Sequence, residues 1–375
     1  MRETILTNAR LVLPDAVMDG TLVLRGGTIA EVQPGRSHAA SALDCQGDHV
    51  IPGIVDLHTD NLERQVQPRA GARWPSLSAM LAHDAQTAAS GTTTVFDALC
   101  LGDLGFDNER IETFRNGVAD LDALSGSGLL KSEHFLHLRC ELPAADMPRL
   151  FEPVAEHPLL RFVSLMDHSP GVGQYVDLDR YRAMRARSGM PMAEIEARIA
   201  ALVEQRGRLR GPNRRWLLDR IAPRGIPVAS HDDWHADEIA ENARDGILIS
   251  EFPVSVAAAE AARANGMQVI GGAPNLVRGG SHSGNVAVAE LVSRGLVDAF
   301  ASDYMPPALL EAAWKAEGVP LPAAVAMITE CPARMAGLTD RGRLAPGLRA
   351  DVVRVAAFGA TPVVRQVWRA GERVV

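Results

Sequence analysis

Lysine is nearly absent from this sequence. Lys131 and Lys315 are the only lysines among the 38 basic residues, so arginine carries almost all of the positive charge. The net charge is −8 and no segment concentrates basic residues, which argues against a nucleic-acid partner. Arginine binds phosphate groups through two parallel hydrogen bonds, so the shortage of lysine does not exclude an anionic ligand.

Cysteine and long apolar runs are also scarce. The 4 cysteines are scattered and form no Cys-x-x-Cys pair, which argues against a disulfide framework and a cysteine zinc site. Residues 1–14 have mixed polarity, unlike a signal peptide, and no apolar stretch reaches the roughly 18 residues of a membrane span. We therefore expect a cytoplasmic protein without a membrane partner.

The length of 375 residues fits a (β/α)8 barrel, which needs about 250, together with a smaller module. Short apolar runs alternate with alanine-rich helical stretches across residues 53–339, which predicts an α/β fold of TIM-barrel type. Strand patterns broken by turn glycines occupy residues 1–52 and return in 340–375, so we expect both ends to form one small β-sandwich module. A doubly wound open sheet is the alternative, but its glycine-rich phosphate motif is missing after the first strand.

A long segment, residues 169–230, interrupts this alternation. Ile195, Ile199, Leu202 and Val203 recur there at helical spacing between charged residues, which predicts an amphipathic helix. A surface helix packed on the barrel is the simpler interpretation. A lid over the active site is the functional alternative, because loops on a rigid scaffold often carry binding residues.

The clearest chemical signal ends the first strand of the barrel segment. An apolar run that follows Pro52-Gly53 leads into His58 and Asp60. Side chains two residues apart on a strand point to the same side. We therefore expect the two side chains to face the mouth of the barrel and to bind one metal ion together.

Further polar residues follow apolar runs in the same way: Glu141, His168, His231 and Asp303. The carboxyl ends of all strands meet at one mouth of a (β/α)8 barrel, so these residues are expected to converge with the first pair. A single histidine can equally be a hydrogen-bonded core residue, but unpaired buried charges at every strand end would be costly. We therefore predict one or two divalent ions per chain, zinc before manganese or magnesium.

Such a site supports hydrolysis. A bound metal ion lowers the pKa of water towards about 7. Asp303, at the end of the last strand, is the expected general base that takes the proton from the attacking water.

The order of these residues resembles the amidohydrolase superfamily. Its members carry a metal-binding pair after strand one, a bridging acidic group near strand four, histidines after strands five and six, and an aspartate after strand eight. Residues 342–353 are also similar to its return into a small β module. The resemblance implies a metal-dependent hydrolase. This sequence departs from it in having His-x-Asp for His-x-His and no lysine at a strand end, so Glu141 takes the bridging position.

A narrower resemblance, to the phosphonate-metabolism family of this superfamily, rests on residues 57–63, 137–143, 163–171, 229–233, 272–285 and 302–304. It implies that the substrate is a small phosphorylated sugar phosphonate, α-D-ribose 1-methylphosphonate 5-triphosphate. The products would be pyrophosphate and α-D-ribose 1-methylphosphonate 5-phosphate. This diphosphatase reaction belongs to the carbon–phosphorus lyase pathway of organic phosphonate catabolism.

The loop of residues 278–285 suits an anionic substrate of this kind. Its glycines free backbone N–H groups, and an arginine adds a positive charge. A turn-rich loop with solvent-facing polar groups is the alternative interpretation. The residues expected to bind substrate there are Arg278, Gly279, Gly280, Ser281 and His282.

Three residues elsewhere are also candidates for substrate binding. His137 and Arg139 share the strand face of Glu141. Arg139 is expected to reach a phosphoryl oxygen or to pair with a carboxylate, and His137 to support the ligands from behind or to contact the substrate. Arg69, close after the first metal motif, is a weaker candidate.

Two other functions are consistent with the sequence. The barrel and its ligands would serve equally in the hydrolysis of an amide, a lactam or an aminated ring. A non-catalytic scaffold on the same fold would be expected to lose ligands, yet none of the predicted positions carries an inert residue. The sequence leaves open the number and identity of the metal ions and the formation of a homo-oligomer.

Overall fold

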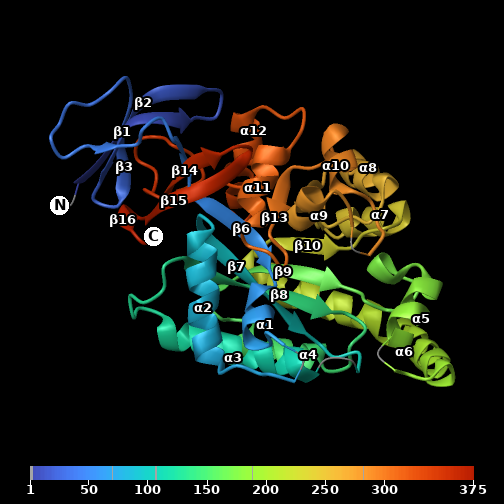
Figure 1. Ribbon diagram of the computed structural model, residues 1–375. Helices are drawn as coiled ribbons and strands as arrows, with labels where there is room; N and C mark the ends of the chain where they lie inside the picture. Colours follow the sequence, from blue (N-terminus) through green and yellow to red (C-terminus); the bar gives the residue numbers. More distant parts are fainter. Residues whose placement is uncertain (1–2, 70, 106–107, 188, 282) are drawn as a thin grey trace.

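The computed structural model describes residues 3–69, 71–105, 108–187, 189–281 and 283–375 (Figure 1). Eight parallel strands, paired in chain order, form its central sheet. They are β6 (Ile54–Thr59), β7 (Thr92–Leu101), β8 (Glu133–Glu141), β9 (Leu160–Met166), β10 (Val228–His231), β11 (Ile249–Glu251), β12 (Gln268–Gly272) and β13 (Ala299–Ala301).

The two edge strands of this sheet meet and close it into a barrel. Thr59, the last residue of β6, forms a parallel bridge with Asp303, which follows β13. The N–H of Asp303 donates to the carbonyl of His58 at 2.9 Å, and the N–H of Asp60 donates to the carbonyl of Asp303 at 2.6 Å. The closure confirms the (β/α)8 barrel and brings the first and last predicted metal ligands side by side.

Buried side chains fill the barrel, so it is a packed core and not a pore. Every residue of β7 is buried, as expected for a parallel strand that is covered on both faces. The interior holds one cluster of apolar side chains, which includes Val55, Leu57, Phe96, Phe162, Ile249 and Ile270. Polar side chains are concentrated at the carboxyl ends of the strands, above this core.

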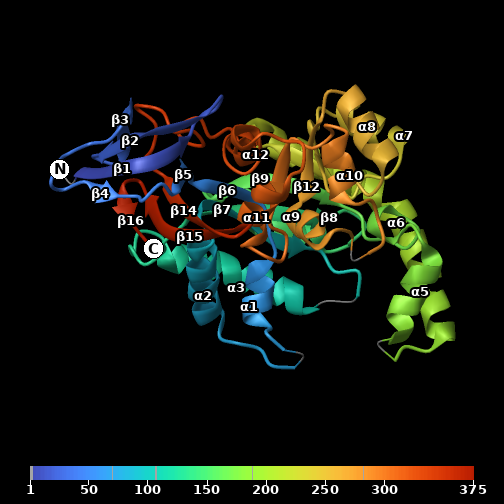
Figure 2. The ribbon, with the colours of Figure 1, turned by 45° about the horizontal axis from the view of Figure 1, so that its top comes forward.

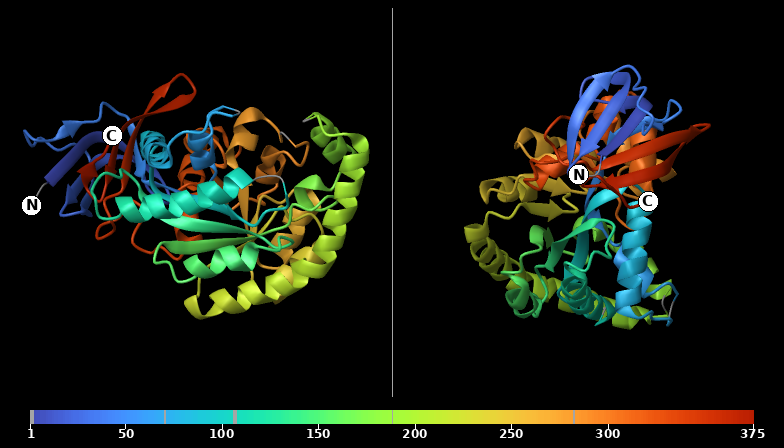
Figure 3. Two further views of the ribbon diagram at one scale, coloured as in Figure 1. Left: turned by 90° about the horizontal axis from the view of Figure 1, so that it is seen from below. Right: turned by 90° about the vertical axis from the view of Figure 1, so that its left-hand side faces the viewer.

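Helices cover the outside of the barrel (Figures 1 and 3). The 3-10 turns are η1 (Glu152–Val154), η2 (Gly173–Tyr175) and η3 (Ala222–Arg224). The α-helices are α1 (Asn61–Val66), α2 (Ser76–Ala89), α3 (Asn108–Leu124), α4 (Met147–Phe151), α5 (Leu178–Arg187), α6 (Met192–Ile221), α7 (Ala236–Arg244), α8 (Val256–Ala264), α9 (Ala273–Arg278), α10 (Val288–Ser293), α11 (Ala308–Lys315), α12 (Leu321–Ala326) and α13 (Glu330–Met335).

The two chain ends form one separate module, as predicted (Figures 1 and 2). Hydrogen bonds join all of its strands into a single mixed sheet, in which β5 pairs parallel with β1 and antiparallel with β14. Leu6, Leu22, Val50, Val352 and Trp368 share one buried core, so neither chain end can bury its apolar face alone. Its strands are β1 (Glu3–Val12), β2 (Val17–Arg25), β3 (Thr28–Pro34), β4 (Leu43–Asp44), β5 (His49–Pro52), β14 (Val352–Phe358), β15 (Thr361–Arg369) and β16 (Glu372–Arg373). The division of the chain after residues 52 and 339 stays a prediction.

The long inserted segment forms η2, α5 and α6 (Figure 3). The expected amphipathic helix is present as α6, whose C-terminal residues Leu217 and Ile221 belong to the main core. Tyr181 of α5 forms a small cluster of its own with Ile195 and Ile199 of α6. The segment therefore has one half that packs on the barrel and one half that projects from it. No helix within the described residues is long and apolar enough to cross a membrane.

Candidate active site

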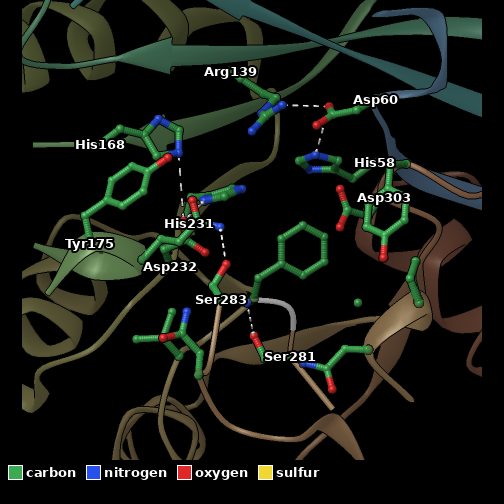
Figure 4. Close-up of a pocket in the computed structure, with 18 of the residues that line it drawn as sticks. His58, Asp60, Arg139, His168, Tyr175, His231, Asp232, Ser281, Ser283 and Asp303 are labelled. Carbon is green, nitrogen blue, oxygen red and sulfur yellow. Dashed lines mark hydrogen bonds and ion pairs between the residues drawn. The ribbon is translucent and has the colours of Figure 1, made fainter. Parts of the chain in front are cut away.

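A cavity of about 470 Å³ lies at the carboxyl ends of the barrel strands (Figure 4). All six residues predicted to bind metal line it: His58, Asp60, Glu141, His168, His231 and Asp303. They come from the ends of β6, β8, β9, β10 and β13, so barrel closure brings them together from positions far apart in the sequence.

Potential ligand atoms in this cavity form three overlapping groups, and within each group they lie within 4.8 Å of one another. The first group contains His58, Asp60 and Asp303. The other two share His231, one with His58 and Glu251, the other with His168 and Asp232. Because the groups share His58 and His231, the same residues could hold either one ion or two neighbouring ions.

Glu251 is a functional residue that the sequence reasoning missed. It is the last residue of β11 and is fully buried. Its Oε1 lies 2.9 Å from Nδ1 of His58, and its Oε2 accepts a hydrogen bond from Ser164 at 2.8 Å. The same signal that revealed the other residues was present, because Glu251 ends the apolar run that begins at Ile247.

Asp232 is a second residue that the sequence reasoning passed over. Its Oδ2 lies 3.1 Å from Nδ1 of His231 and 3.9 Å from Nε2 of His168. Asp232 and Asp303 each adopt a positive φ of 55°, in the left-handed region that side chains other than glycine rarely occupy. Such strained positions cluster at functional sites, where the surrounding structure holds them in place.

Glu141 lies behind His168. Its Oε2 is 2.7 Å from Nδ1 of His168, and its Oε1 accepts the backbone N–H of His168 at 2.8 Å. Among the described residues Glu141 belongs to none of the three ligand groups. This geometry fits a carboxylate that orients a histidine ligand, and the bridging role expected for Glu141 stays a prediction.

Arg139 pairs with a carboxylate, one of the two roles considered for it. Its Nη1 donates to Oδ1 of Asp60 at 2.6 Å, and the guanidinium is buried. Burial favours the neutral form of Asp60, but Arg139, His58 and Arg110 together outweigh it and hold the pKa of Asp60 well below its usual range. Asp60 is thus an anion at neutral pH.

Asp303 differs from Asp60 in its protonation. Burial, and then the nearby charge of Asp60, raise the pKa of Asp303 to about 7. Two carboxylates so close together repel each other, and a divalent cation bound to both would remove that repulsion.

The donor set therefore fits a divalent metal ion. It combines imidazole nitrogens with carboxylate oxygens, the ligands that zinc and manganese accept. In addition, Nε2 of His231 is buried and has no hydrogen-bond partner among the described residues. A buried polar atom of this kind needs a ligand, and the cavity lined by His231 is where that ligand would bind.

His137 lies behind the ligands and does not line the cavity. Its Nδ1 lies 2.9 Å from the carbonyl of Leu57 and its Nε2 lies 2.6 Å from Oγ of Ser164. Burial lowers the pKa of His137 to about 3, so the ring is neutral. Through Ser164, which donates to Glu251, it supports the carboxylate that holds His58.

The glycine-rich loop contributes less to the cavity than the sequence suggested. The N–H groups of Gly279 and Gly280 donate to carbonyls of Leu276 and Asn275, so these glycines end helix α9. Ser281 lines the cavity, and Arg278 reaches it indirectly through a 3.3 Å hydrogen bond to the hydroxyl of Tyr304.

Two of the predicted substrate-binding residues cannot be placed in the cavity. His282 lies outside the described residues. Arg69 is exposed, pairs through its backbone with Ala72, and is not among the residues that line the cavity.

Arginines that the sequence did not single out line the cavity instead: Arg64, Arg110 and Arg185. They come from helices α1, α3 and α5, which the chain reaches only after leaving a strand end. No strand pattern marks such positions, so only the three-dimensional arrangement reveals them.

Comparisons with known proteins identify the class of this barrel. A model of the amidohydrolase family matches residues 222–375. N-acetylglucosamine-6-phosphate deacetylase from Pasteurella multocida shares the fold with a TM-score of 0.64 and 14% identity over 99% of each chain. 5-Methylcytosine deaminase from Klebsiella pneumoniae aligns with a TM-score of 0.62 and 16% identity, over 99% of this chain and 98% of that one. The chain belongs to the amidohydrolase family.

One relative is similar over its whole length. The chain is 39% identical over 376 residues to α-D-ribose 1-methylphosphonate 5-triphosphate diphosphatase of Escherichia coli (strain K12). The match covers 99% of this chain and 100% of the relative, so it spans both the barrel and the module of the chain ends. It confirms the resemblance drawn from the sequence motifs.

Proposed function

We propose that this hydrolase cleaves α-D-ribose 1-methylphosphonate 5-triphosphate to pyrophosphate and α-D-ribose 1-methylphosphonate 5-phosphate. One observation carries the proposal: metal-ligand residues and three arginines converge in a single cavity of a chain that matches a diphosphatase over its full length. Arginine suits phosphate oxygens, which an amide substrate lacks. We place this reaction in cytoplasmic phosphonate catabolism.

The residues proposed to hold the metal are His58, Asp60, His168, His231 and Asp303, with zinc favoured over manganese and magnesium. A divalent ion bound there would stabilise charge on the phosphoryl oxygens and lower the pKa of a water molecule towards about 7. His58 and His168 are kept in orientation by Glu251 and Glu141 respectively.

Asp303 is proposed as the general base. Its carboxylate shares a ligand group with His58 and Asp60, so it would lie next to a water molecule bound to an ion held there. Asp303 takes a proton from the attacking water while the oxygen of that water forms a bond to the α-phosphorus. The bond from the α-phosphorus to the bridging oxygen breaks, and pyrophosphate leaves. Arg139 keeps Asp60 ionised beside this base.

Replacement of Asp303 by Asn tests this assignment. We expect Asp303→Asn to lower kcat by at least about 100-fold, because loss of a general base costs that much or more. Release of pyrophosphate should be measured at equal metal content, since Asp303 is also a proposed ligand. Asp122→Asn, which removes an exposed carboxylate paired with His157 away from the cavity, is the control. Full turnover by Asp303→Asn with its metal bound would exclude the residue as the base.

Hydrolysis of an amide, a lactam or an aminated ring is the alternative function. The metal-ligand set alone would serve such substrates equally well, and release of pyrophosphate separates the two. A non-catalytic scaffold is the third candidate, and a protein purified without bound metal would favour it.

A further inference from the structure

Besides Arg64, which donates to the carbonyl of Tyr304, two arginines and a tyrosine reach the cavity from outside the barrel strands. Arg110 belongs to the first turn of α3, Tyr175 ends η2, and Arg185 belongs to the last turns of α5. All three line the cavity beside His168. η2 and α5 are parts of the inserted segment, so this segment contributes side chains directly to the site.

These three side chains form one cluster. All three line the same cavity, and the positive charges of Arg185 and Arg110 oppose the burial that raises the pKa of Tyr175. The Tyr175 ring centroid is 6.0 Å from that of His168. The cluster is therefore continuous with the proposed metal ligands.

Neighbouring residues hold the two arginines in place. Arg110 Nε lies 3.3 Å from Oε2 of Glu63, and the guanidinium of Arg185 lies 5.1 Å from the centroid of the Tyr181 ring. Asp103 also lines this part of the cavity.

Neutral groups line another part of the cavity. Ser281, Ser283 and Asn285 offer hydroxyl and amide groups there (Figure 4). Ser283 accepts a hydrogen bond from Gln174 of η2 at 3.2 Å, so this part adjoins the inserted segment as well. Among these lining residues the guanidinium groups carry the positive charge that an anionic group needs.

The two ends of the proposed substrate differ in charge. Beyond the α-phosphorus, one end is a pyrophosphate group with several negative charges, and the other is a sugar that carries a phosphonate ester with fewer. Guanidinium groups bind phosphate oxygens in pairs and remain charged at every physiological pH.

We propose that Arg110, Arg185 and Tyr175 form the subsite for the leaving pyrophosphate. The inference rests on the proposed function for the identity of the ligand. Through Arg185, helix α5 would favour substrates that carry two further phosphates after the α-phosphate.

The test compares the binding of the two products. Arg185→Met and Arg110→Met are prepared with bound metal, and the Kd of each protein for pyrophosphate and for ribose 1-methylphosphonate 5-phosphate is measured by calorimetry. We expect the Kd for pyrophosphate to rise at least about tenfold in each variant, as for the loss of a hydrogen bond between charged groups. The Kd for the sugar phosphonate should change less than about twofold, and Arg185→Lys should retain part of the affinity for pyrophosphate.

Matched controls come from the same helices. Arg187 of α5 and Arg115 of α3 are exposed and do not line the cavity, so Arg187→Met and Arg115→Met should bind both products like the wild type. Metal content and thermal unfolding of every variant are recorded, so that a loss of ligands or of the fold is recognised.

Failure of this inference differs from failure of the proposed function. Unchanged affinity for pyrophosphate in both cavity variants, or equal losses for the two products, would overturn the subsite even if the wild type hydrolyses the triphosphate. Selective loss of pyrophosphate binding would support the subsite even if another triphosphate proved to be the substrate. A wild-type protein that holds metal but does not bind pyrophosphate would contradict the inference outright.

Discussion

Two of the three proposed histidine ligands at the mouth of the barrel are held by a glutamate behind them. Glu251 holds His58 and Glu141 holds His168, with N–O distances of 2.9 Å and 2.7 Å. A hydrogen bond at one ring nitrogen fixes the tautomer and the orientation of the ring, so the other nitrogen is directed into the cavity. Metal affinity should therefore depend on residues that lie behind the ligands as well as on the ligands themselves.

Replacement of Glu251 by Gln tests this dependence. Glu251→Gln removes the negative charge beside His58 while keeping the size of the side chain. We expect a loss of metal affinity of about 10- to 100-fold, measured by competition with a chromogenic chelator. Glu241→Gln on α7 changes a carboxylate that pairs with Arg210 away from the cavity and should bind metal like the wild type. Equal metal affinity in Glu251→Gln and the wild type would contradict the role of this carboxylate.

Single residues show where sequence reasoning succeeded. His58, Glu141 and Asp303 each lie at or just after the end of an apolar run. Polar residues at the ends of predicted strands therefore indicated the site. Glu251 follows the same pattern, because it ends the apolar run that begins at Ile247. Arg110 and Arg185 belong to helices, whose distance from the site depends on packing that no local pattern encodes.

Glycine patterns were ambiguous at this scale. Gly279 and Gly280 end helix α9, and Gly279 adopts the left-handed conformation typical of that position. A helix end and an anion-binding loop need the same backbone freedom, so composition alone does not separate them.

At the scale of elements, the inserted segment touches the glycine-rich loop across the cavity. Arg180 of α5 donates from Nη1 to the carbonyl of Ser283 at 2.7 Å, and Gln174 donates to Oγ of Ser283 at 3.2 Å. A Cβ atom on Gly284 would lie 1.6 Å from Nη1 of Arg180, so glycine permits this approach. The contact is consistent with the predicted lid.

Removal of that contact tests the lid. Arg180→Ala should raise KM for the triphosphate several-fold and leave metal content unchanged, because α5 would no longer be joined to the loop. Gly284→Ala, which displaces Arg180, should have the same effect. Arg182→Ala is the control. It removes another arginine of α5, which pairs with Glu196 of α6. Steady-state parameters equal to those of the wild type in both variants would mean that the segment does not close over the site.

A second cluster of ionisable residues lies between α2 and the barrel wall. His134 of β8 is 2.8 Å from Asp97 and 3.1 Å from Asp84, and His83 is 2.6 Å from Asp97. All four side chains are buried. Burial favours the neutral form of His134, but Asp97 and Asp84 outweigh it and raise its pKa to about 9.

This cluster predicts a pH dependence of stability. Folding raises the pKa of His134. The stabilisation that His134 adds to the free energy of unfolding is therefore complete below about pH 6.5, the pKa of a free histidine. It is lost as the pH rises towards about 9. We expect the free energy of unfolding to fall by on the order of 2 kcal/mol across this window, as measured by urea unfolding. His134→Gln should lose this pH dependence, and an identical slope in that variant would contradict the assignment.

At the scale of the whole molecule, the fold was predictable in outline. Alternation of apolar runs with helical stretches predicted the barrel, and the strand patterns at both ends predicted their common module. Closure could not be derived from a local pattern, because it depends on backbone hydrogen bonds between residues as distant as His58 and Asp303. That closure joins two proposed metal ligands, so fold and site depend on the same contact.

The proposed reaction is hydrolysis of the triphosphate at its α-phosphorus, which requires a bound divalent metal ion. The most direct measurement is phosphorus NMR of the ribose methylphosphonate triphosphate in ¹⁸O-labelled water, with and without chelator. We predict release of pyrophosphate, ¹⁸O in the sugar 5-phosphate and none in pyrophosphate, an intact carbon–phosphorus bond, and no reaction with chelator until metal is restored. Absence of pyrophosphate from a fully metal-loaded protein, or ¹⁸O found in the pyrophosphate, would contradict the account.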